Sequence, residues 1–234
     1  MIMAYHRVNP WYKDDALTVS PENFERQIQY LLKRKFKPAA PDEYISNYSL
    51  STIHYPLFLI TFDDGYADNL LYALPVMKKY GIAPLIFLTV NYMGTENVFQ
   101  RYRDKEKDRM LNWEEAREMS AGGVFFGSHS LSHPHLPRIS AENLRTEVEE
   151  SKKIIEDKTG REVDYFCYPY GDFSEGVIEA VQRAGYRGAF VTPGAKKSVK
   201  KSSYTLSRTG VYGHNGFTAF RIKTWKDYLT EKYF

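Results

Sequence analysis

Short apolar runs alternate with amphipathic helical patterns along this chain, and that alternation limits the folds open to it. The apolar runs lie at 2–5, 57–62, 85–90, 124–127, 163–168, 186–191 and 204–211. A run of this length followed by a helix, repeated about seven times, predicts parallel strands joined by helices. The sequence therefore predicts an α/β fold built on an open parallel sheet or a barrel.

Capping residues mark where several of the helices begin. Ser20 stands before Pro21, the combination that favours the first turn of a helix, and apolar residues then recur at helical spacing up to position 32. Asn112 and Ser140 precede further helical patterns, and another helix is expected over 174–184, closed by Gly185. A helix is also expected from the end of the 57–62 run to about 80, where Gly81 ends it.

Length and composition favour one folded domain over residues 1–234. The chain is 43% hydrophobic, which is enough to form a sizeable core. Its net charge is +3 and its basic residues are scattered, so a nucleic-acid partner is not expected. The basic stretch 196–201 is predicted to be a solvated loop.

Neither a disulfide nor a membrane span is expected. Cys167 is the single cysteine, and no apolar run approaches the ~20 residues of a transmembrane helix. The first residues lack the basic and apolar regions of a signal peptide, which predicts a cytoplasmic location for the chain as given. A chain from which a signal peptide had been removed would lack these regions as well. Oligomeric state is left open.

Polar side chains stand at or just past the carboxyl ends of the predicted strands. They are His6, Asp63, Asp64, His129, Tyr168 and Tyr170. In a parallel α/β barrel these strand ends share one face, where active sites are built. One common site is therefore predicted, with unconnected polar loops as the alternative.

Two adjacent carboxylates, Asp63 and Asp64, directly follow the run 57–62 and precede Gly65. Neighbouring side chains at a strand end point in different directions, so one carboxylate can bind a cation while the other accepts a proton. Gly65 allows a tight backbone turn. The alternative is an ordinary Asp-Gly turn with a helix cap.

His129 and His133 are four residues apart, a common spacing of metal ligands. On a single helical turn both imidazoles would face the same way. Two histidines and one carboxylate leave positions open on a metal, as catalytic sites require. A divalent ion is predicted, with Zn²⁺ the default and Co²⁺, Ni²⁺ or Fe²⁺ suited to the same ligands. His135 either supports these ligands or faces solvent.

The segment Cys167-Tyr168-Pro169-Tyr170-Gly171 follows the run 163–168. Its proline and glycine favour a rigid loop that can present a backbone N–H group. An ordinary turn is the alternative.

These three motifs, in this order, resemble those of the polysaccharide deacetylases with a NodB-homology domain, carbohydrate esterase family 4. The matching pieces are Thr-Phe-Asp-Asp-Gly at 61–65, His-x-x-x-His at 129–133 and Pro-Tyr-Gly at 169–171. The resemblance covers most of the chain and implies a distorted (β/α)7 barrel. It also implies three metal ligands, a general base and an oxyanion donor: Asp64, His129 and His133 for the metal, Asp63 for the base, and the Tyr170 N–H for the oxyanion.

The chain looks closest to the branch of the family that contains poly-β-1,6-N-acetylglucosamine deacetylases. Tyr5-His6-x-Val8, Trp113 and Leu206-Ser207-Arg208 carry this finer likeness. The candidate substrate or oxyanion contacts are accordingly His6, Trp113, Tyr168, Pro169, Tyr170 and Arg208.

The chain departs from the family at two positions. Many members carry an arginine that holds the catalytic aspartate where this chain has Cys167, and Arg208 stands where the late histidine, the general acid, is usual. Arg208 is expected to take the place of the missing arginine beside Asp63. His214, a few residues later, is the candidate acid.

The resemblance implies metal-dependent hydrolytic N-deacetylation of a saccharide containing N-acetylglucosamine, with release of acetate. Two alternatives stay open. One is the hydrolysis of another amide, in a lipid-linked sugar, in peptidoglycan or outside sugars; the other is a carbohydrate-binding protein without activity. The presence of both Asp63 and Asp64 argues against the second, because binding alone does not need the base. Linkage and chain length of the substrate are not specified.

Overall fold

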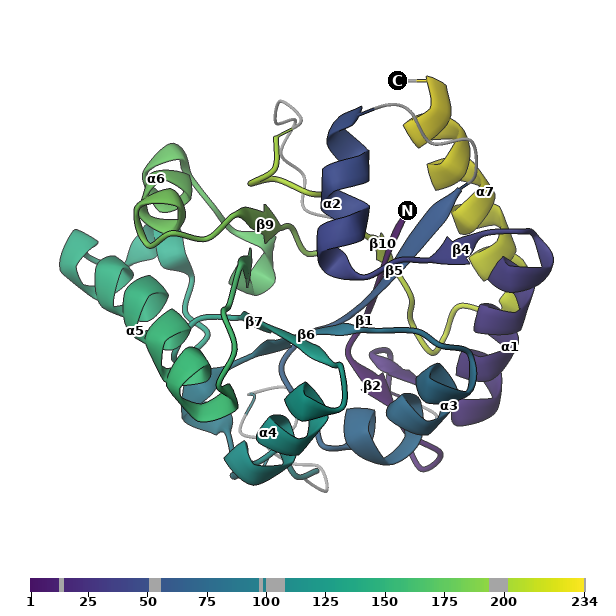
Figure 1. Ribbon diagram of the computed structural model, residues 1–234, viewed down its shortest axis with the longest axis horizontal. Coiled ribbons are helices and arrows are strands. Elements are labelled where there is room, and N and C mark those ends of the chain that lie inside the picture. The colour runs from purple at the N-terminus through teal and green to yellow at the C-terminus, as the bar shows by residue number, and fades with distance from the viewer. Residues whose placement is uncertain (13–14, 51–55, 97–98, 100–107, 194–201, 234) are drawn as a thin grey trace. The chain divides into compact units, whose positions relative to one another are not determined.

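The computed structural model describes residues 1–12, 15–50, 56–96, 99, 108–193 and 202–233 (Figure 1). The chain divides into two compact units. The first consists of Met1–Phe62, Asp68–Leu85 and Arg208–Phe234, and the second of Asp63–Ala67 and Ile86–Ser207. The predicted single domain remains a prediction. The basic stretch 196–201 lies outside the described residues.

A parallel sheet forms the centre of the first unit. Strand β1 (Ile2–Tyr5) lies between β5 (Leu57–Phe62) and β10 (Thr209–Gly210), and β4 (Lys37–Pro38) pairs with β5. Every residue of β1 and β5 is buried, as expected for parallel strands covered on both faces. A separate parallel pair joins β2 (Arg7–Val8) to β3 (Thr18–Val19).

Helix α1 (Pro21–Lys33) begins where the sequence predicts. The Ser20 hydroxyl accepts the N–H of Asn23 at 3.3 Å, and Phe24, Ile28 and Leu31 form the buried face. The other helices of this unit are α2 (Pro41–Leu50), the π-helix η1 (Asn69–Ala73), α3 (Leu74–Lys79) and α7 (Phe217–Tyr233).

The second unit repeats the pattern of strand and helix. Its strands follow the order β6 (Leu85–Leu88, in this unit from Ile86 on), β7 (Phe125–Ser128), β8 (Tyr165–Cys167) and β9 (Gly188–Phe190). The pairs β7–β8 and β8–β9 are parallel. A β-carbon on Gly127 would lie 2.6 Å from the Phe87 ring and 2.8 Å from the Tyr165 carbonyl oxygen, so only glycine lets these strands approach this closely.

Three helices accompany these strands: α4 (Trp113–Ala121), α5 (Ala141–Thr159) and α6 (Glu175–Arg183). In Figure 1, α5 lies between α4 and α6, and it packs against β7. A reciprocal capping box begins α4, in which the Asn112 side chain accepts the Glu115 N–H while Glu115 accepts the Asn112 N–H, both at 2.9 Å. Ser140 and Ser174 cap α5 and α6. Short 3₁₀ turns follow the strands at Val90–Tyr92, Leu136–Arg138 and Pro169–Gly171.

The α/β class and the predicted caps are confirmed, while several boundaries differ. The run 85–90 ends as a strand at Leu88, and the run 163–168 forms a strand only at Tyr165–Cys167. The predicted strand 204–211 is wrong in extent, because Leu206 bridges to Phe190 in the second unit and Thr209–Gly210 pairs with β1 in the first. Helices α2 and α7 were not predicted. Across the described segments, every helix is too short or too polar to cross a membrane.

Candidate metal and catalytic centre

Three loops of the second unit bring the predicted chemistry together. They are the segment 63–67, the loop after β7 and the loop after β8. Asp64, His129 and His133 place their ligand atoms within 4.8 Å of one another, and so do Asp63, His129 and Cys167. The predicted metal ligands and the predicted base therefore lie in one cluster.

The segment 63–67 holds both carboxylates in the interior. Asp63 is fully buried and Asp64 is 5% exposed. The backbone turns through left-handed conformations at Asp64 (φ +75°) and Gly65 (φ +83°), and a β-carbon on Gly65 would lie 2.9 Å from Leu88 Cδ2. The Leu111 N–H donates to the Gly65 carbonyl at 2.9 Å, which fixes the turn from outside.

The loop 129–133 differs from the helical turn that the spacing predicts. Ser130 (φ +70°) and His133 (φ +59°) are left-handed, so the chain bends instead of forming a helix. The Ser130 hydroxyl accepts the His133 N–H at 3.0 Å, which closes the bend. The two imidazoles still meet, with ring centroids 4.8 Å apart. The predicted ligands lie close together, but a bent loop and not a helix brings them there.

Glu147 of α5 fastens this loop. One carboxylate oxygen accepts the N–H groups of Leu131 and Ser132, each at 2.9 Å, and the other accepts the Ser132 hydroxyl at 2.5 Å. The Asn91 N–H also donates to the Leu131 carbonyl at 2.9 Å. The histidine loop is thus bonded both to α5 and to the turn after β6.

The histidines face a single carboxylate oxygen. Nε2 of His129 lies 3.6 Å and Nε2 of His133 lies 3.7 Å from Asp64 Oδ1. Around a tetrahedral ion, bonds of about 2.0 Å separate such ligand atoms by about 3.3 Å. If each histidine nitrogen moved about 0.4 Å closer to the Asp64 oxygen, all three atoms could bind one ion. This donor set therefore fits a divalent cation.

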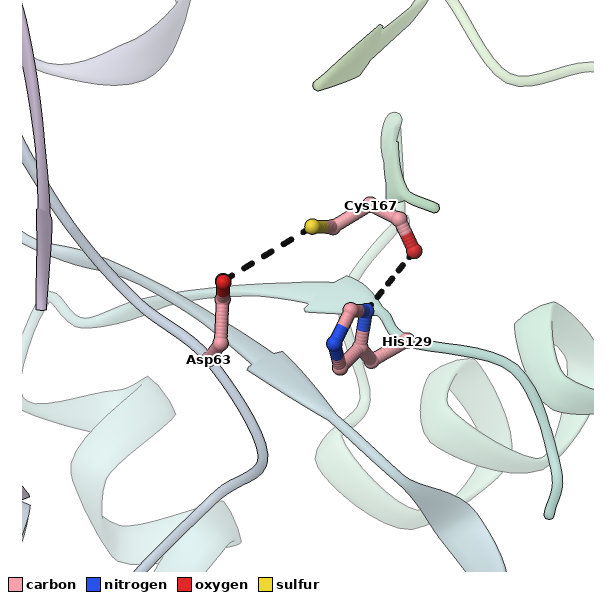
Figure 2. Close-up of side chains that lie close together, drawn as sticks. All are labelled: Asp63, His129 and Cys167. Atoms are coloured by element: carbon pink, nitrogen blue, oxygen red, sulfur yellow. Dashed lines mark hydrogen bonds between the residues drawn. The ribbon is translucent and has the colours of Figure 1, made fainter. Parts of the chain in front are cut away.

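The carbonyl of Cys167 sets the tautomer of His129. Nδ1 of His129 lies 2.7 Å from that oxygen, which can only accept, so Nδ1 carries the proton. Nε2 is then the nitrogen with a lone pair for a metal, and a bond of this kind orients the ring. Figure 2 shows the same cysteine turned to both partners, with its carbonyl on His129 and its sulfur toward Asp63.

The Cys167 thiol contacts the predicted base. Sγ lies 3.7 Å from Asp63 Oδ1 and donates to it, and both residues are fully buried. A thiol is a weak donor, so this contact holds the carboxylate far less firmly than a guanidinium would.

Strained backbone gathers at these loops. Of the five non-glycine residues with positive φ among those described, all but Lys35 belong here: Asp64, Ser130, His133 and Tyr170. Such conformations cost about 1–3 kcal/mol each and persist where the surrounding structure enforces them. Their concentration here marks the cluster as the candidate functional centre of this unit.

Tyr170 provides an exposed aromatic surface beside the ligands. Its ring is stacked on His135 at 4.1 Å and meets the His133 ring edge-on at 4.5 Å, while 54% of the residue is exposed. Partial burial, followed by the negative charge of Asp64, raises the pKa of the Tyr170 hydroxyl above its usual value, so the hydroxyl stays a donor at neutral pH. Nδ1 of His135 lies 3.2 Å from Asp172 Oδ2. His135 is thus held by Asp172 while its ring supports the ring of Tyr170.

The other predicted contacts have varied surroundings. Tyr168 is buried and its hydroxyl donates to the Tyr204 carbonyl at 3.0 Å, and Pro169 is buried as well. Trp113 begins α4 and is half-buried. Their contacts with substrate remain predictions.

His6, Arg208 and His214 belong to the first unit. Arg208 donates from Nη1 to the Thr61 hydroxyl at 3.0 Å, and His214 is exposed and stacked on Tyr212. Their predicted roles remain predictions.

Two contributors to the centre were not predicted from the sequence. Glu147 lies on a helix whose charged residues all look alike in sequence, and only its bonds to Leu131 and Ser132 distinguish it. Cys167 was noted as a departure from the family pattern, but its two contacts require the folded chain to be seen.

Comparison with known proteins places the chain in a family. The model of the family Polysaccharide deacetylase matches residues 54–189. The chain is 27% identical over 213 residues to YxkH of Bacillus subtilis, provisionally named a polysaccharide deacetylase, covering 90% of this chain and 70% of that protein. It is 23% identical over 202 residues to the poly-β-1,6-N-acetyl-D-glucosamine N-deacetylase of Staphylococcus aureus, covering 82% and 67%.

A solved structure shows the same fold. The deacetylase PplD of Streptococcus pyogenes, in complex with acetate, superposes with a TM-score of 0.79 at 21% identity, over 95% of this chain and 96% of that one. This likeness confirms the predicted distorted (β/α)7 barrel. The motif residues 61–65, 129–133 and 169–171 all lie within the matched range. The chain belongs to the polysaccharide deacetylase family.

Proposed function

We propose that this protein is a metal-dependent N-deacetylase of saccharides that contain N-acetylglucosamine. The observation that carries the proposal is the buried cluster itself. Asp64, His129 and His133 converge as a set that can hold a metal ion, and a second carboxylate, Asp63, stands beside it. Amide hydrolysis needs both a metal ion and a base, because an acetamido carbonyl is a poor electrophile at neutral pH.

A divalent cation bound by Asp64, His129 and His133 would polarise the acetamido carbonyl and lower the pKa of water toward neutrality. Zn²⁺ is the default, since two imidazoles and one carboxylate with open positions suit it. The hydrogen bond from His129 Nδ1 to the Cys167 carbonyl supports this role, because it leaves Nε2 as the ligand.

Asp63 is the proposed general base. As water attacks the carbonyl carbon, the Asp63 carboxylate accepts its proton. The Tyr170 N–H donates to the oxyanion that forms, and one such donor is typically worth about 3 kcal/mol. The left-handed backbone at Tyr170, held within the turn Pro169–Gly171, supports a fixed N–H in this position.

The leaving amine needs a proton, and His214 is the proposed donor because an imidazole can serve as a general acid. Arg208 is the proposed cationic partner of Asp63 and would keep it ionised. A pH–rate profile tests both roles. His214→Ala should remove the alkaline limb, and Arg208→Met should move the acidic limb to higher pH, since a carboxylate without its cation has a raised pKa. An unchanged profile in either variant removes that residue from the mechanism.

A sugar is the proposed substrate because an exposed aromatic ring stands beside the metal ligands. Tyr170, backed by His135, offers a flat face and a donor hydroxyl to a pyranose ring. The names of the Staphylococcus aureus relative and others like it support a β-1,6-linked N-acetylglucosamine polymer as the first compound to test.

The test is acetate release from a panel of N-acetylated compounds. β-1,6-linked and β-1,4-linked N-acetylglucosamine oligomers, peptidoglycan fragments and a simple non-sugar acetamide would be compared, with Asp63→Asn as the matched inactive control. Release from an oligosaccharide that depends on Asp63 supports the proposal. Turnover of the non-sugar amide alone would assign a different amidase, and binding of oligosaccharide without any release would indicate a carbohydrate-binding protein.

A further inference from the structure

Cys167 gives the centre a second set of metal ligands. Asp63, His129 and Cys167 bring a carboxylate oxygen, an imidazole nitrogen and a sulfur within 4.8 Å of one another (Figure 2). Their exposed fractions are 0%, 2% and 0%, so the three donors converge inside the protein and not on its surface.

The spacing of this second set suits a tetrahedral ion. Cys167 Sγ and Asp63 Oδ1 are 3.7 Å apart. Bonds of about 2.3 Å to sulfur and about 2.0 Å to oxygen would place these two atoms about 3.5 Å apart around a tetrahedral ion. An ion could therefore bind between them with little movement of either side chain.

His129 is common to both sets. Its Nδ1 is engaged by the Cys167 carbonyl, so Nε2 is the atom available to a metal. Figure 2 shows that ring nitrogen on the side that faces Asp63, and it also lies 3.6 Å from Asp64 Oδ1. One nitrogen lone pair binds one ion at a time, so occupation of one set excludes the other.

We propose that Asp63, His129 and Cys167 form an inhibitory site for thiophilic metal ions, which competes with the catalytic ion for His129. Soft thiolate ligands favour soft ions, whereas the set without sulfur accepts harder ones. On binding, a metal–sulfur bond forms, the S–H bond breaks and the proton leaves to solvent. The inhibition rests on the proposed function, because a bound ion would occupy the carboxylate of the general base. The binding itself does not.

Cadmium(II) is the probe, because cadmium–thiolate bonds absorb in the ultraviolet where the free ion does not. Metal-free protein would be titrated with cadmium chloride, and Cys167 is the single cysteine, so any such absorption reports on it. The native chain should reach saturation at one equivalent. Absence of the absorption in the folded native chain overturns the proposal.

Two neighbouring carboxylates supply a matched pair of variants. Asp63→Asn should weaken cadmium binding by at least about tenfold, as expected when one ligand is lost. Asp64→Asn makes the same chemical change one residue away, in the other set, and should leave the affinity within about threefold. If both changes weakened cadmium binding equally, or if neither weakened it, Asp63, His129 and Cys167 would not form a separate set.

Inhibition is measured as a second arm. Each protein's rate of acetate release is compared with its own rate without cadmium, and Cys167→Ser should need at least about tenfold more cadmium for half-inhibition. Equal sensitivity of the two proteins would overturn the inhibitory role. If no acetate is released by any protein, the proposed function fails, while the absorption titration still decides whether the site exists.

Discussion

Glu147 should govern the metal affinity of the site without touching the metal. Its carboxylate accepts three hydrogen bonds from Leu131 and Ser132, and these hold the loop that carries His129 and His133. Glu147→Ala removes all three. The loop then keeps the backbone bonds from the turn after β6, such as the one from Asn91 to Leu131.

The magnitude follows from the strain in the loop. Left-handed conformations at Ser130 and His133 cost about 1–3 kcal/mol each. Hydrogen bonds to a charged acceptor contribute about 1.5–3 kcal/mol each, but Glu147 is only partly buried and water competes for it. If the competent loop falls to between about 1% and 10% of the population, the apparent dissociation constant rises by about 10- to 100-fold.

Competition with a chelating dye on metal-free protein measures this change for Zn²⁺. Glu147→Gln is the first control, because its amide oxygen can still accept the two backbone N–H groups, and its affinity should stay within about threefold of the native value. Glu150→Ala is the second, since Glu150 is an exposed residue of the same helix. A folded Glu147→Ala protein with native zinc affinity would refute the view that this residue shapes the site.

Three further changes probe the base, the packing and the capping. Asp63→Asn should keep the metal, shown by elemental analysis, but lose about 10²- to 10⁴-fold in turnover, because an amide cannot accept the proton; near-native turnover would make Asp63 a structural residue. Gly127→Ala should lower the free energy of unfolding in urea by about 1–3 kcal/mol or more, because its β-carbon would meet the Phe87 ring and the Tyr165 carbonyl. Gly176→Ala in α6, with open space around the new carbon, should be neutral or stabilising by up to about 1 kcal/mol, and equal effects at the two glycines would contradict the packing argument. Asn112→Ala should cost about 1 kcal/mol in the same measurement, because it removes the capping bond to Glu115; no loss would mean that the cap is not needed.

Local signals in the sequence predicted the parts of the fold that depend on neighbouring residues. Ser20, Asn112 and Ser140 mark helix starts because a cap forms within a few positions of itself. The prediction of one strand over 204–211 was wrong, because an apolar run does not reveal that its residues pair with two different strands.

In the site, too, features set by nearby residues were predicted and features set by distant residues were not. His129 and His133 were proposed as ligands from their spacing, yet the bent loop that brings them together is bonded to Glu147, which is 14 or more positions away in sequence. The double role of Cys167 could not be seen either, because its partners Asp63 and His129 come from two other loops. Candidate ligands are recognised by residue type and order, whereas the residues that support them are set by tertiary packing.

The dependence of acetate release on added Zn²⁺ tests the central claim most directly. Metal-free protein would be assayed with an N-acetylglucosamine oligomer while zinc is added in steps below and above one equivalent. We expect no release without metal and a rise that ends near one equivalent per chain, as one catalytic ion bound by Asp64, His129 and His133 predicts. Full activity in the metal-free protein would contradict the account.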